Sequence, residues 1–348
     1  MHKAQPTTGE PIAVVTACDE NYVRGAAAAI RSAIDSVGPE QPVRVFVLDG
    51  GITDRSKARL VRSWRQPNVV TEFLQPDLAA IDDMHTSDHI NLSTYLRILL
   101  ADLVPADVTK AIYLDADTIV RRDLTHLWSE PLGDALCAAT NDIFHPYLNP
   151  RQALPRPTHC MLLQVNPEPI PNYRELGLAG TEPYFNAGVM LVNVERWRRE
   201  QFSSQAFECL RDNADHVRYW DQYALNVLCS GRWKSVDARW NQNSHTYRLP
   251  GWHLSHLDQA EFERLKHDPW IVHFDYVPKP WDLDSKHPFR QDFFRALDRT
   301  CWWWWRPRRP MRERLQILHQ NYRRWRQKNW SPRVRAWKER WLGRRRAA

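Results

Sequence analysis

Two aspartates, Asp115 and Asp117, follow directly after the apolar residues 111–114. Side chains at positions i and i+2 of an extended chain point the same way, so the sequence predicts that both carboxylates face one site. Two like charges this close repel each other unless a positive group lies between them. A divalent cation, Mg²⁺ or Mn²⁺, suits carboxylate oxygens and keeps positions open for phosphate oxygens. A solvated loop with two exposed acids is the alternative for this pattern taken alone.

Polar residues in two earlier segments can serve the same site. Asp19 and Tyr22 follow the first apolar run, where a carboxylate can accept from a base N–H or a ribose hydroxyl and a ring can stack on a base. A helix N-cap and a packed tyrosine are the alternative. Arg97 stands among apolar residues with helical spacing and can bind a sugar hydroxyl or a phosphate. A structural ion pair is its alternative role.

Polar residues in the second half of the chain add to this set. Asn186 precedes a predicted tight turn at Gly188, and Asp221 and Gln222 open a predicted helix. Their amide and carboxyl groups can hold sugar hydroxyls, and helix caps and turns are the alternative.

His273 and Lys279 form the last candidate pair. His273 ends a short apolar run, and Lys279 stands between two prolines six residues later. The imidazole can be the third metal ligand, which favours Mn²⁺ over Mg²⁺, although a single histidine also occurs as a core residue. The lysine can offset the charge of a diphosphate leaving group.

The segments that must position these residues alternate between strands and helices. Apolar runs predict strands at 12–17, 43–48, 69–74, 111–114, 189–192 and 271–274. Helical patterns are found at 30–37, 55–65, 92–103, 194–201, 204–213 and 221–229. This alternation predicts an α/β fold with a mostly parallel sheet covered by helices on both faces. Ligands of such sheets bind beyond the carboxyl ends of the strands. The Pro-rich residues 143–183 predict a long loop that shapes the site.

Taken in order, these segments resemble the family-8 glycosyltransferases, which are retaining enzymes of the GT-A fold. The resemblance covers residues 12–281 and is greatest to the bacterial lipopolysaccharide galactosyl- and glucosyltransferases. The motifs that carry it are Ala-x-Asp-x-Asn-Tyr at 17–22, Tyr-x-Arg at 95–97, Leu-Asp-x-Asp at 114–117, Phe-Asn-Ala-Gly at 185–188, Asp-Gln at 221–222 and His-Phe at 273–274 with Lys-Pro-Trp at 279–281. The resemblance implies a doubly wound sheet with a nucleotide-binding half and an acceptor-binding half.

The resemblance also assigns roles to residues of this chain. Uridine would be bound by Ala17, Asp19, Asn21 and Tyr22, and the rest of the donor by Arg97, Ala116, Asn186 and Ala187. The metal would be held by Asp115, Asp117 and His273. Asp221 and Gln222 would flank the anomeric carbon, and Lys279 would steady the diphosphate. Tyr276 departs from the family, which usually has glycine there, and this puts a backbone contact to the diphosphate in doubt.

The activity implied is metal-dependent transfer of a hexose, from UDP-glucose or UDP-galactose, to a saccharide acceptor such as lipopolysaccharide or another lipid-linked glycan. We expect same-face attack in which the leaving phosphate accepts the proton, and a nucleophilic Asp221 is the less favoured route. Two alternatives are a catalytically inactive nucleotide-binding relative and a sugar-nucleotide pyrophosphorylase. A pyrophosphorylase normally has a Gly-rich loop after the first strand, and residues 17–24 contain no glycine.

The charge of the chain is unevenly distributed. The 348 residues hold 48 Lys and Arg and 41 Asp and Glu, but 16 of the basic residues and only two acids follow residue 301. Eight of the 17 tryptophans lie in the same segment. We therefore predict a catalytic domain at 1–285 and a basic, Trp-rich helical tail at 286–348 that associates with an anionic membrane surface. A helix packed on the domain is one alternative, and nucleic-acid binding is another that the acidic body of the chain argues against.

Two further features suggest a location. No run of 18 apolar residues is present, and the first residues lack the apolar stretch of a signal peptide. The six cysteines are scattered without a C-x-x-C pair, which predicts reduced thiols. We expect a cytoplasmic protein attached peripherally to the inner face of the cytoplasmic membrane.

Overall fold

The computed structural model describes residues 9–77, 84, 92–154, 168–308, 318–326 and 337. The chain divides into two compact units. The first comprises Met1–Pro280 and Ser285–Trp304, and the second Trp281–Asp284 and Trp305–Ala348. The predicted division at residue 285 stays a prediction. Residues 309–317 of the predicted helical tail lie outside the described residues, whereas residues 318–326 are helical.

The first unit is built on a seven-stranded sheet with the strand order β3-β2-β1-β4-β7-β6-β8. Its strands are β1 (Ile12–Cys18), β2 (Val43–Asp49), β3 (Val69–Leu74), β4 (Lys110–Leu114), β6 (Cys137–Asn141), β7 (Phe185–Asn193) and β8 (Trp233–Ser235). Strand β7 runs antiparallel to both of its neighbours, and the other pairings are parallel. The predicted α/β fold with a mostly parallel sheet is therefore confirmed.

A second, three-stranded sheet lies beside the first. Its order is β5-β10-β9, with β5 (Thr118–Val120), β10 (Ile271–His273) and β9 (Gln242–Asn243). The sequence predicted a strand at 271–274 but not that it would leave the main sheet. Because β5 begins immediately after the Asp115–Asp117 turn and pairs with β10, residue 118 lies opposite His273. This pairing brings two segments far apart in the chain to one place.

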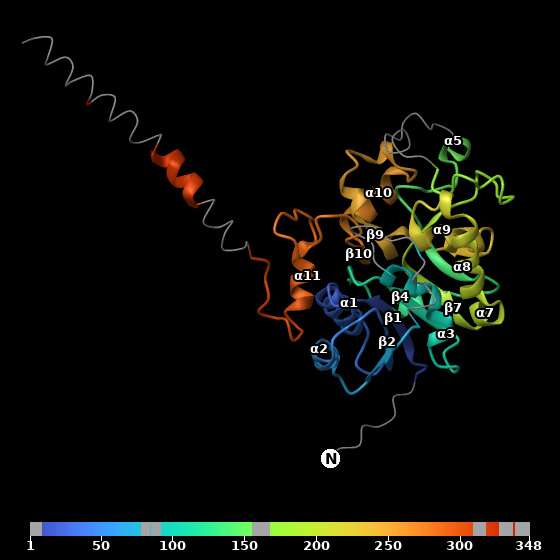
Figure 1. Cartoon of the computed structure of the whole chain (residues 1–348), viewed down its shortest axis with the longest axis horizontal. Helices are drawn as coiled ribbons and strands as arrows, with labels where there is room; N and C mark the ends of the chain where they lie inside the picture. The colour runs from blue at the N-terminus through green and yellow to red at the C-terminus, as the bar shows by residue number, and fades with distance from the viewer. Residues whose placement is uncertain are drawn as a thin grey trace, which may run out of the picture. The chain divides into compact units, whose positions relative to one another are not determined.

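Helices surround the sheet (Figure 1). They are α1 (Val23–Ser36), α2 (Asp54–Trp64), α3 (Leu100–Leu103), α4 (Thr125–Trp128), α5 (Pro150–Ala153), α7 (Val194–Arg199), α8 (Phe202–Asp212), α9 (Trp220–Cys229), α10 (Gln259–His267) and α11 (Arg290–Leu297). The 3₁₀ helices are η2 (Leu92–Leu99), η4 (Ala214–His216), η5 (Ala238–Asn241), η6 (Ser244–Tyr247) and η7 (Trp252–Leu254). Helix α1 packs against β1, α2 and α11, and α9 packs against β7 and α8. None of the described helices is both long and apolar enough to cross a lipid bilayer.

The order of the strands fixes where a ligand can bind. The chain adds β2 and β3 on one side of β1 and then returns to add β4 on the other side. A crevice forms where the order of parallel strands reverses in this way, beyond their carboxyl ends. All seven residues of β1 are buried, as expected for a strand covered on both faces. The ends of β1 and β4 therefore open on the same crevice, as the sequence predicted.

Two details of the predicted secondary structure were wrong. Gly188 lies within the continuous strand β7 and not in a tight turn. The leucines of 92–103 form a 3₁₀ helix followed by one short α-helical turn, not one α-helix. The described part of the Pro-rich region has little regular structure, apart from α5 and a bridge between Tyr147 and Pro183.

Candidate active site

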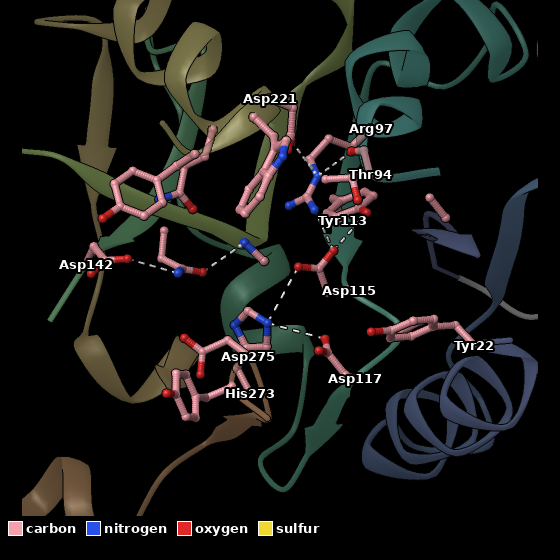
Figure 2. Close-up of a pocket in the computed structure, with 18 of the residues that line it drawn as sticks. Tyr22, Thr94, Arg97, Tyr113, Asp115, Asp117, Asp142, Asp221, His273 and Asp275 are labelled. Carbon is pink, nitrogen blue, oxygen red and sulfur yellow. Dashed lines mark hydrogen bonds and ion pairs between the residues drawn. The ribbon is translucent and has the colours of Figure 1, made fainter. Parts of the chain in front are cut away.

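A cavity of about 580 Å³ opens at the carboxyl ends of β1 and β4. Its lining includes most of the residues predicted to form the site, namely Ala17, Tyr22, Arg97, Asp115, Ala116, Asp117, Asn186, Asp221, Gln222, His273 and Lys279. Asp115, Asp117 and His273 lie between Tyr22 on one side and Asp142 on the other (Figure 2). Residues separated by more than 250 positions in the sequence therefore share one cavity.

The Asp115–Asp117 segment forms a turn between β4 and β5. The Asp115 carbonyl accepts from the backbone N–H of Thr118 at 3.2 Å and from its hydroxyl at 2.8 Å. The backbone is not extended here, which corrects the predicted conformation. Both carboxylates nevertheless face His273, with Asp115 Oδ2 3.5 Å and Asp117 Oδ1 3.3 Å from its Nε2. The turn therefore brings the two carboxylates to one site, as the sequence predicted for an extended chain.

The imidazole of His273 is oriented by Asn241. Asn241 donates its amide N–H to Asn186, so its Oδ1 is left to accept from His273 Nδ1 at 2.9 Å. That bond places a proton on Nδ1 and turns Nε2 toward the two carboxylates. Burial opposes a charge on the imidazole, but Asp117 raises the pKa of His273, and Nε2 would give up its proton on binding a metal. A carboxylate pair with a neutral imidazole nitrogen is a donor set for a divalent metal, and the ligand atoms of the three residues lie within 4.8 Å of one another.

Gly188 makes room for this cluster. A Cβ atom at Gly188 would lie 2.2 Å from His273 Cε1 and 2.9 Å from Asp115 Oδ2. The backbone carbonyl of Gly188 also accepts from the N–H of Asp115 at 2.8 Å. Glycine is thus required here for close approach of two side chains. The residues present fit a bound divalent cation.

Lys279 is held beside the same cluster. Its Nζ lies 2.6 Å from Asp117 Oδ2 and donates to the carbonyl of Phe274 at 2.7 Å. Burial opposes both charges, but the ion pair prevails, so the pKa of Asp117 is lowered and that of Lys279 is raised. Both groups are charged at neutral pH, and the ammonium lies at the edge of the carboxylate pair.

Arg97 links the two halves of the cavity. Its Nη2 lies 3.0 Å from Asp115 Oδ1, its Nε 2.8 Å from Asp221 Oδ2, and its Nη1 donates to the Ala187 carbonyl at 2.8 Å. Burial opposes the charge of the guanidinium, but Asp115 and Asp221 raise its pKa. The ion pair that the sequence offered as the alternative role is therefore present. Arg97 fixes the position of both carboxylates.

Asp221 and Gln222 begin α9 and point toward β7. Burial raises the pKa of Asp221 to about 6 even though Arg97 opposes the shift. The Gln222 Oε1 accepts from the backbone N–H of Ala187 at 3.0 Å, and its Nε2 donates to the Tyr184 hydroxyl at 3.0 Å. The amide is therefore held at both ends, and its orientation is fixed. Ala187 itself contributes backbone groups only.

Asn186 is the centre of another buried network. Its Nδ2 donates to Asp142 Oδ2 at 3.0 Å, and its Oδ1 accepts from the backbone N–H of Gly188 at 3.0 Å. Because Asn241 also donates to Asn186, this network connects the β7 strand to the residue that orients His273. Asn186 thus accepts a bond from the backbone two residues later, as in a turn, although it lies within strand β7.

The first strand-to-helix turn lines the other end of the cavity. Tyr22 faces the cavity near Asp117, whereas Asp19 and Asn21 are not among its lining residues. The Asp19 carboxylate accepts from the backbone N–H of Tyr22 at 3.0 Å and from the Asn21 amide at 3.1 Å. These bonds stabilise the turn that carries Ala17 and Tyr22. The predicted contacts of Asp19 and Asn21 with uridine stay a prediction.

Of the further lining residues, only Tyr276 was singled out in the sequence. They include Asp142, Phe144, His145, Tyr219, Trp220, His245, Arg248, Asp275 and Tyr276. The irregular region 143–183 supplies only Phe144 and His145 of these. Asp275 follows a predicted strand and Trp220 precedes a predicted helix, but such a position alone does not separate site residues from ordinary loop residues. Nothing in the sequence marked Asp142, His245 or Arg248.

Tyr276 occupies the position at which the family pattern has glycine. The φ angle of Tyr276 is not positive, so the backbone at this position can carry a side chain without strain. Its ring lies 5.3 Å from that of His245, and the Arg248 guanidinium lies 4.4 Å above it. Tyr276 and Arg248 therefore form an aromatic and cationic wall of the cavity.

Comparisons with known proteins agree with this geometry. A relative from Bacillus subtilis, "General stress protein A", is 27% identical over 83% of this chain and 94% of its own length. The "Lipopolysaccharide 1,3-galactosyltransferase" of Salmonella typhimurium is 22% identical over 86% of this chain and 81% of its own length. The solved structure of the galactosyltransferase LgtC in complex with donor and acceptor sugar analogues superposes with a TM-score of 0.68 at 26% identity, covering 87% of this chain and 99% of that one.

The likeness to LgtC identifies the fold as the GT-A type with a mostly parallel central sheet. The model of the family described as "Glycosyl transferase family 8" matches residues 13–285. The chain belongs to glycosyltransferase family 8.

Proposed function

We propose that this glycosyltransferase moves a hexose, glucose or galactose, from a UDP-sugar to a saccharide acceptor and retains the anomeric configuration. The names of the Salmonella relative and of LgtC support a galactosyl or related hexosyl donor and a lipopolysaccharide-type acceptor. The observation that carries the proposal is the convergence of Asp115, Asp117 and His273 Nε2 beside Lys279 at the carboxyl end of β4. Membership of the family argues against a sugar-nucleotide pyrophosphorylase.

Asp115, Asp117 and His273 would hold a divalent ion, Mn²⁺ or Mg²⁺. When bound, the ion would neutralise charge on the diphosphate of the donor. Lys279 would add a second positive charge at the same place, because its ammonium lies 2.6 Å from Asp117. Tyr22 would offer its ring to the uracil, since it faces the cavity at the end of β1. These groups together favour departure of UDP, the largest electrostatic demand of the step.

The arrangement of Asp221 and Gln222 favours same-face attack. The Asp221 carboxylate is engaged by Arg97, and the Gln222 amide is held by Ala187 and Tyr184. A carboxylate that is buried and ion-paired is a poor candidate for a nucleophile, and an amide is poorer still. We infer that the departing phosphate accepts the proton of the acceptor hydroxyl, while Gln222 and Arg97 orient the donor sugar.

A donor screen tests this function. UDP-glucose and UDP-galactose are offered with lipopolysaccharide-core saccharides, with Mn²⁺ or with a chelator, and the product configuration is read by NMR. We expect retained configuration and activity that disappears with the chelator and in Asp117→Asn, but not in the surface control Asp134→Asn. Transfer that persists in Asp117→Asn would refute the metal assignment. A protein that binds UDP yet transfers nothing would instead be an inactive relative.

We also propose that the protein is cytoplasmic and associates peripherally with the inner face of the membrane through its tail. In residues 318–326, Leu318, Tyr322 and Trp325 follow helical spacing, and each is more than half exposed. An amphipathic helix with an apolar face and many basic residues suits a layer of anionic headgroups. A lipid-linked acceptor would be presented at that surface.

A further inference from the structure

A second hollow, of about 520 Å³, lies on the surface of the catalytic unit away from the sugar-nucleotide cavity. Its walls are α2 and the turn that follows α11. Arg55, Arg59 and Arg62 contribute from α2, and Trp303 and Trp304 from the turn. Cationic and indole side chains therefore surround one concave surface, here called the Arg–Trp surface.

The turn is fixed to α2 by specific contacts. The Cys301 N–H donates to the Ser63 hydroxyl at 2.8 Å, and Arg59 donates to the Cys301 carbonyl at 2.8 Å. The Arg59 guanidinium also lies 4.0 Å from the centre of the Trp302 ring. Trp302 is buried by these contacts, at 3% exposure. The first tryptophan of the predicted tail thus belongs to the packed unit, and it anchors the two that follow.

The next two tryptophans are turned outward. Trp303 is 64% exposed and Trp304 is 59% exposed, which places them among the most exposed large apolar side chains of the described residues. An indole that is well anchored through its backbone yet mostly exposed gains little from packing. Tryptophan favours the headgroup region of a bilayer, where the ring is apolar and its N–H can still bond.

The charge of the Arg–Trp surface is not balanced by acids. Arg55, Arg59 and Arg62 stand at i, i+4 and i+7 of α2, and like charges at this spacing destabilise a helix. The ion pairs of the described residues include none for these three arginines. Burial and then the neighbouring arginines lower the pKa of Arg59. An anionic partner that lies against such a stripe would offset this repulsion.

We propose that the Arg–Trp surface docks the catalytic unit on a layer of anionic phospholipid headgroups. The guanidinium groups would bind lipid phosphates, and Trp303 and Trp304 would insert among the headgroups. The proposal extends the association proposed for the tail to the first compact unit, which ends at Trp304. It needs neither residues 305–348 nor the transfer reaction to be correct. It fixes which face of the enzyme is turned to the membrane.

Sedimentation of the full-length protein with vesicles tests the proposal. Vesicles of phosphatidylglycerol and phosphatidylcholine are compared with phosphatidylcholine alone at low salt. We expect Arg55→Gln with Arg62→Gln to weaken partition by about 25-fold, because each basic residue near an anionic surface contributes a factor of about five. Arg55→Lys with Arg62→Lys retains binding, and Trp303→Ser with Trp304→Ser weakens it.

The control variants remove arginine and tryptophan side chains that lie outside the Arg–Trp surface. Arg199→Gln with Arg264→Gln changes two exposed arginines of α7 and α10, and Trp252→Ser removes an exposed indole. We expect both to partition as the wild type does. Transfer to a soluble saccharide by Arg55→Gln with Arg62→Gln should stay at the wild-type rate, so that a failure of the lipid proposal is distinct from a failure of the proposed function.

Two outcomes would overturn the proposal. If the arginine and tryptophan variants bind anionic vesicles as tightly as the wild type, residues 305–348 alone carry the association. If the arginine variant loses affinity for a single-stranded oligonucleotide while its vesicle partition is unchanged, the Arg–Trp surface serves nucleic acid.

Discussion

The ammonium of Lys279 lies 2.6 Å from Asp117 Oδ2, while the other oxygen of the same carboxylate lies 3.3 Å from His273 Nε2. Asp117 therefore contacts both His273, another proposed metal ligand, and Lys279, the cation proposed to bind the diphosphate. Because Lys279 also donates to the Phe274 carbonyl, its position is fixed before any ligand binds. A group fixed in this way costs little reorganisation during the reaction.

Replacing Lys279 by alanine should lower kcat for hexose transfer by about 100- to 1000-fold, since one preorganised charge at the leaving group is removed. The change in the Mn²⁺ requirement should be small, because the three proposed ligands remain. Steady-state kinetics with Mn²⁺ and a UDP-hexose measure both quantities. The exposed Lys286→Ala serves as control, and a Lys279→Ala enzyme within about threefold of it would contradict the role of Lys279.

Replacing Gly188 by alanine should damage the metal site directly. The new Cβ would meet His273 Cε1 at 2.2 Å, so the imidazole or β7 must move. We expect about 1–3 kcal/mol of lost stability and at least about tenfold weaker Mn²⁺ binding. Calorimetry measures both. Gly38→Ala is the matched control, because nothing lies within 4 Å of a Cβ at that position. Equal Mn²⁺ affinity in the two variants would show that the cluster is not a metal site.

Trp220 offers a test of strain at the cavity. It is a bulky residue at φ +47, immediately before Asp221. Left-handed backbone costs a non-glycine residue about 1–2 kcal/mol, so Trp220→Gly should be more stable than Trp220→Ala. This order of stability is the reverse of the usual one in a helix interior, where alanine is more favourable than glycine by about 1 kcal/mol. Urea unfolding of the two variants measures the difference.

The control for Trp220 is Gln201, at φ +52 and outside the cavity lining. Gln201→Gly should also gain stability over Gln201→Ala, but without loss of turnover, whereas both Trp220 variants should transfer more slowly. If Trp220→Gly is the less stable of its pair, the left-handed conformation is not a source of strain.

Much of the fold could be predicted because burial and periodicity act locally. Strands β1, β2 and β4 are mostly apolar, and α1 ends just before Gly38 and Pro39. The location of the site followed from strand order, as Asp19 and Asp115 both come at strand ends. The switch of 271–273 into a second sheet was not predictable, because three residues show no periodicity that distinguishes one partner strand from another.

The residues that position or surround the proposed metal ligands could not be predicted, for a similar reason. Asn241 orients His273, yet its partner lies 32 positions away and nothing in the local sequence marks the pair. Gly188 was expected in a turn because glycine usually marks one. Here it lies within a strand and leaves room for the side chains of His273 and Asp115. The role of Tyr276 depends on packing against His245 and Arg248, which only the folded chain brings together.

Acid should destabilise the protein through buried neutral histidines. Burial lowers the pKa of His145, His256 and His287 to about 4. Below about pH 6.5 the unfolded chain binds these protons and the folded chain does not, so unfolding becomes easier as the pH falls toward 4. Asp221 acts in the opposite direction, because its folded pKa of about 6 lets the folded chain take up a proton first.

The variant His287→Phe isolates one of these protons. His287 packs edge-on against Phe274 with ring centres 4.6 Å apart, so a phenyl ring preserves the shape. The free energy of unfolding of the variant should fall less between pH 6.5 and pH 4, by at most about 1.4 kcal/mol per pH unit. Urea titrations at several pH values measure this slope. An identical pH dependence in both proteins would mean that His287 is protonated in the folded state.

The central claim is that Asp115, Asp117 and His273 hold a divalent ion against the diphosphate of a nucleotide. Anomalous diffraction from crystals soaked with Mn²⁺ and UDP measures it most directly. We predict one manganese peak about 2.0–2.3 Å from a carboxylate oxygen of each aspartate and from His273 Nε2, with diphosphate oxygens completing its coordination. A peak elsewhere, or UDP bound with the three side chains uncoordinated, would contradict the account.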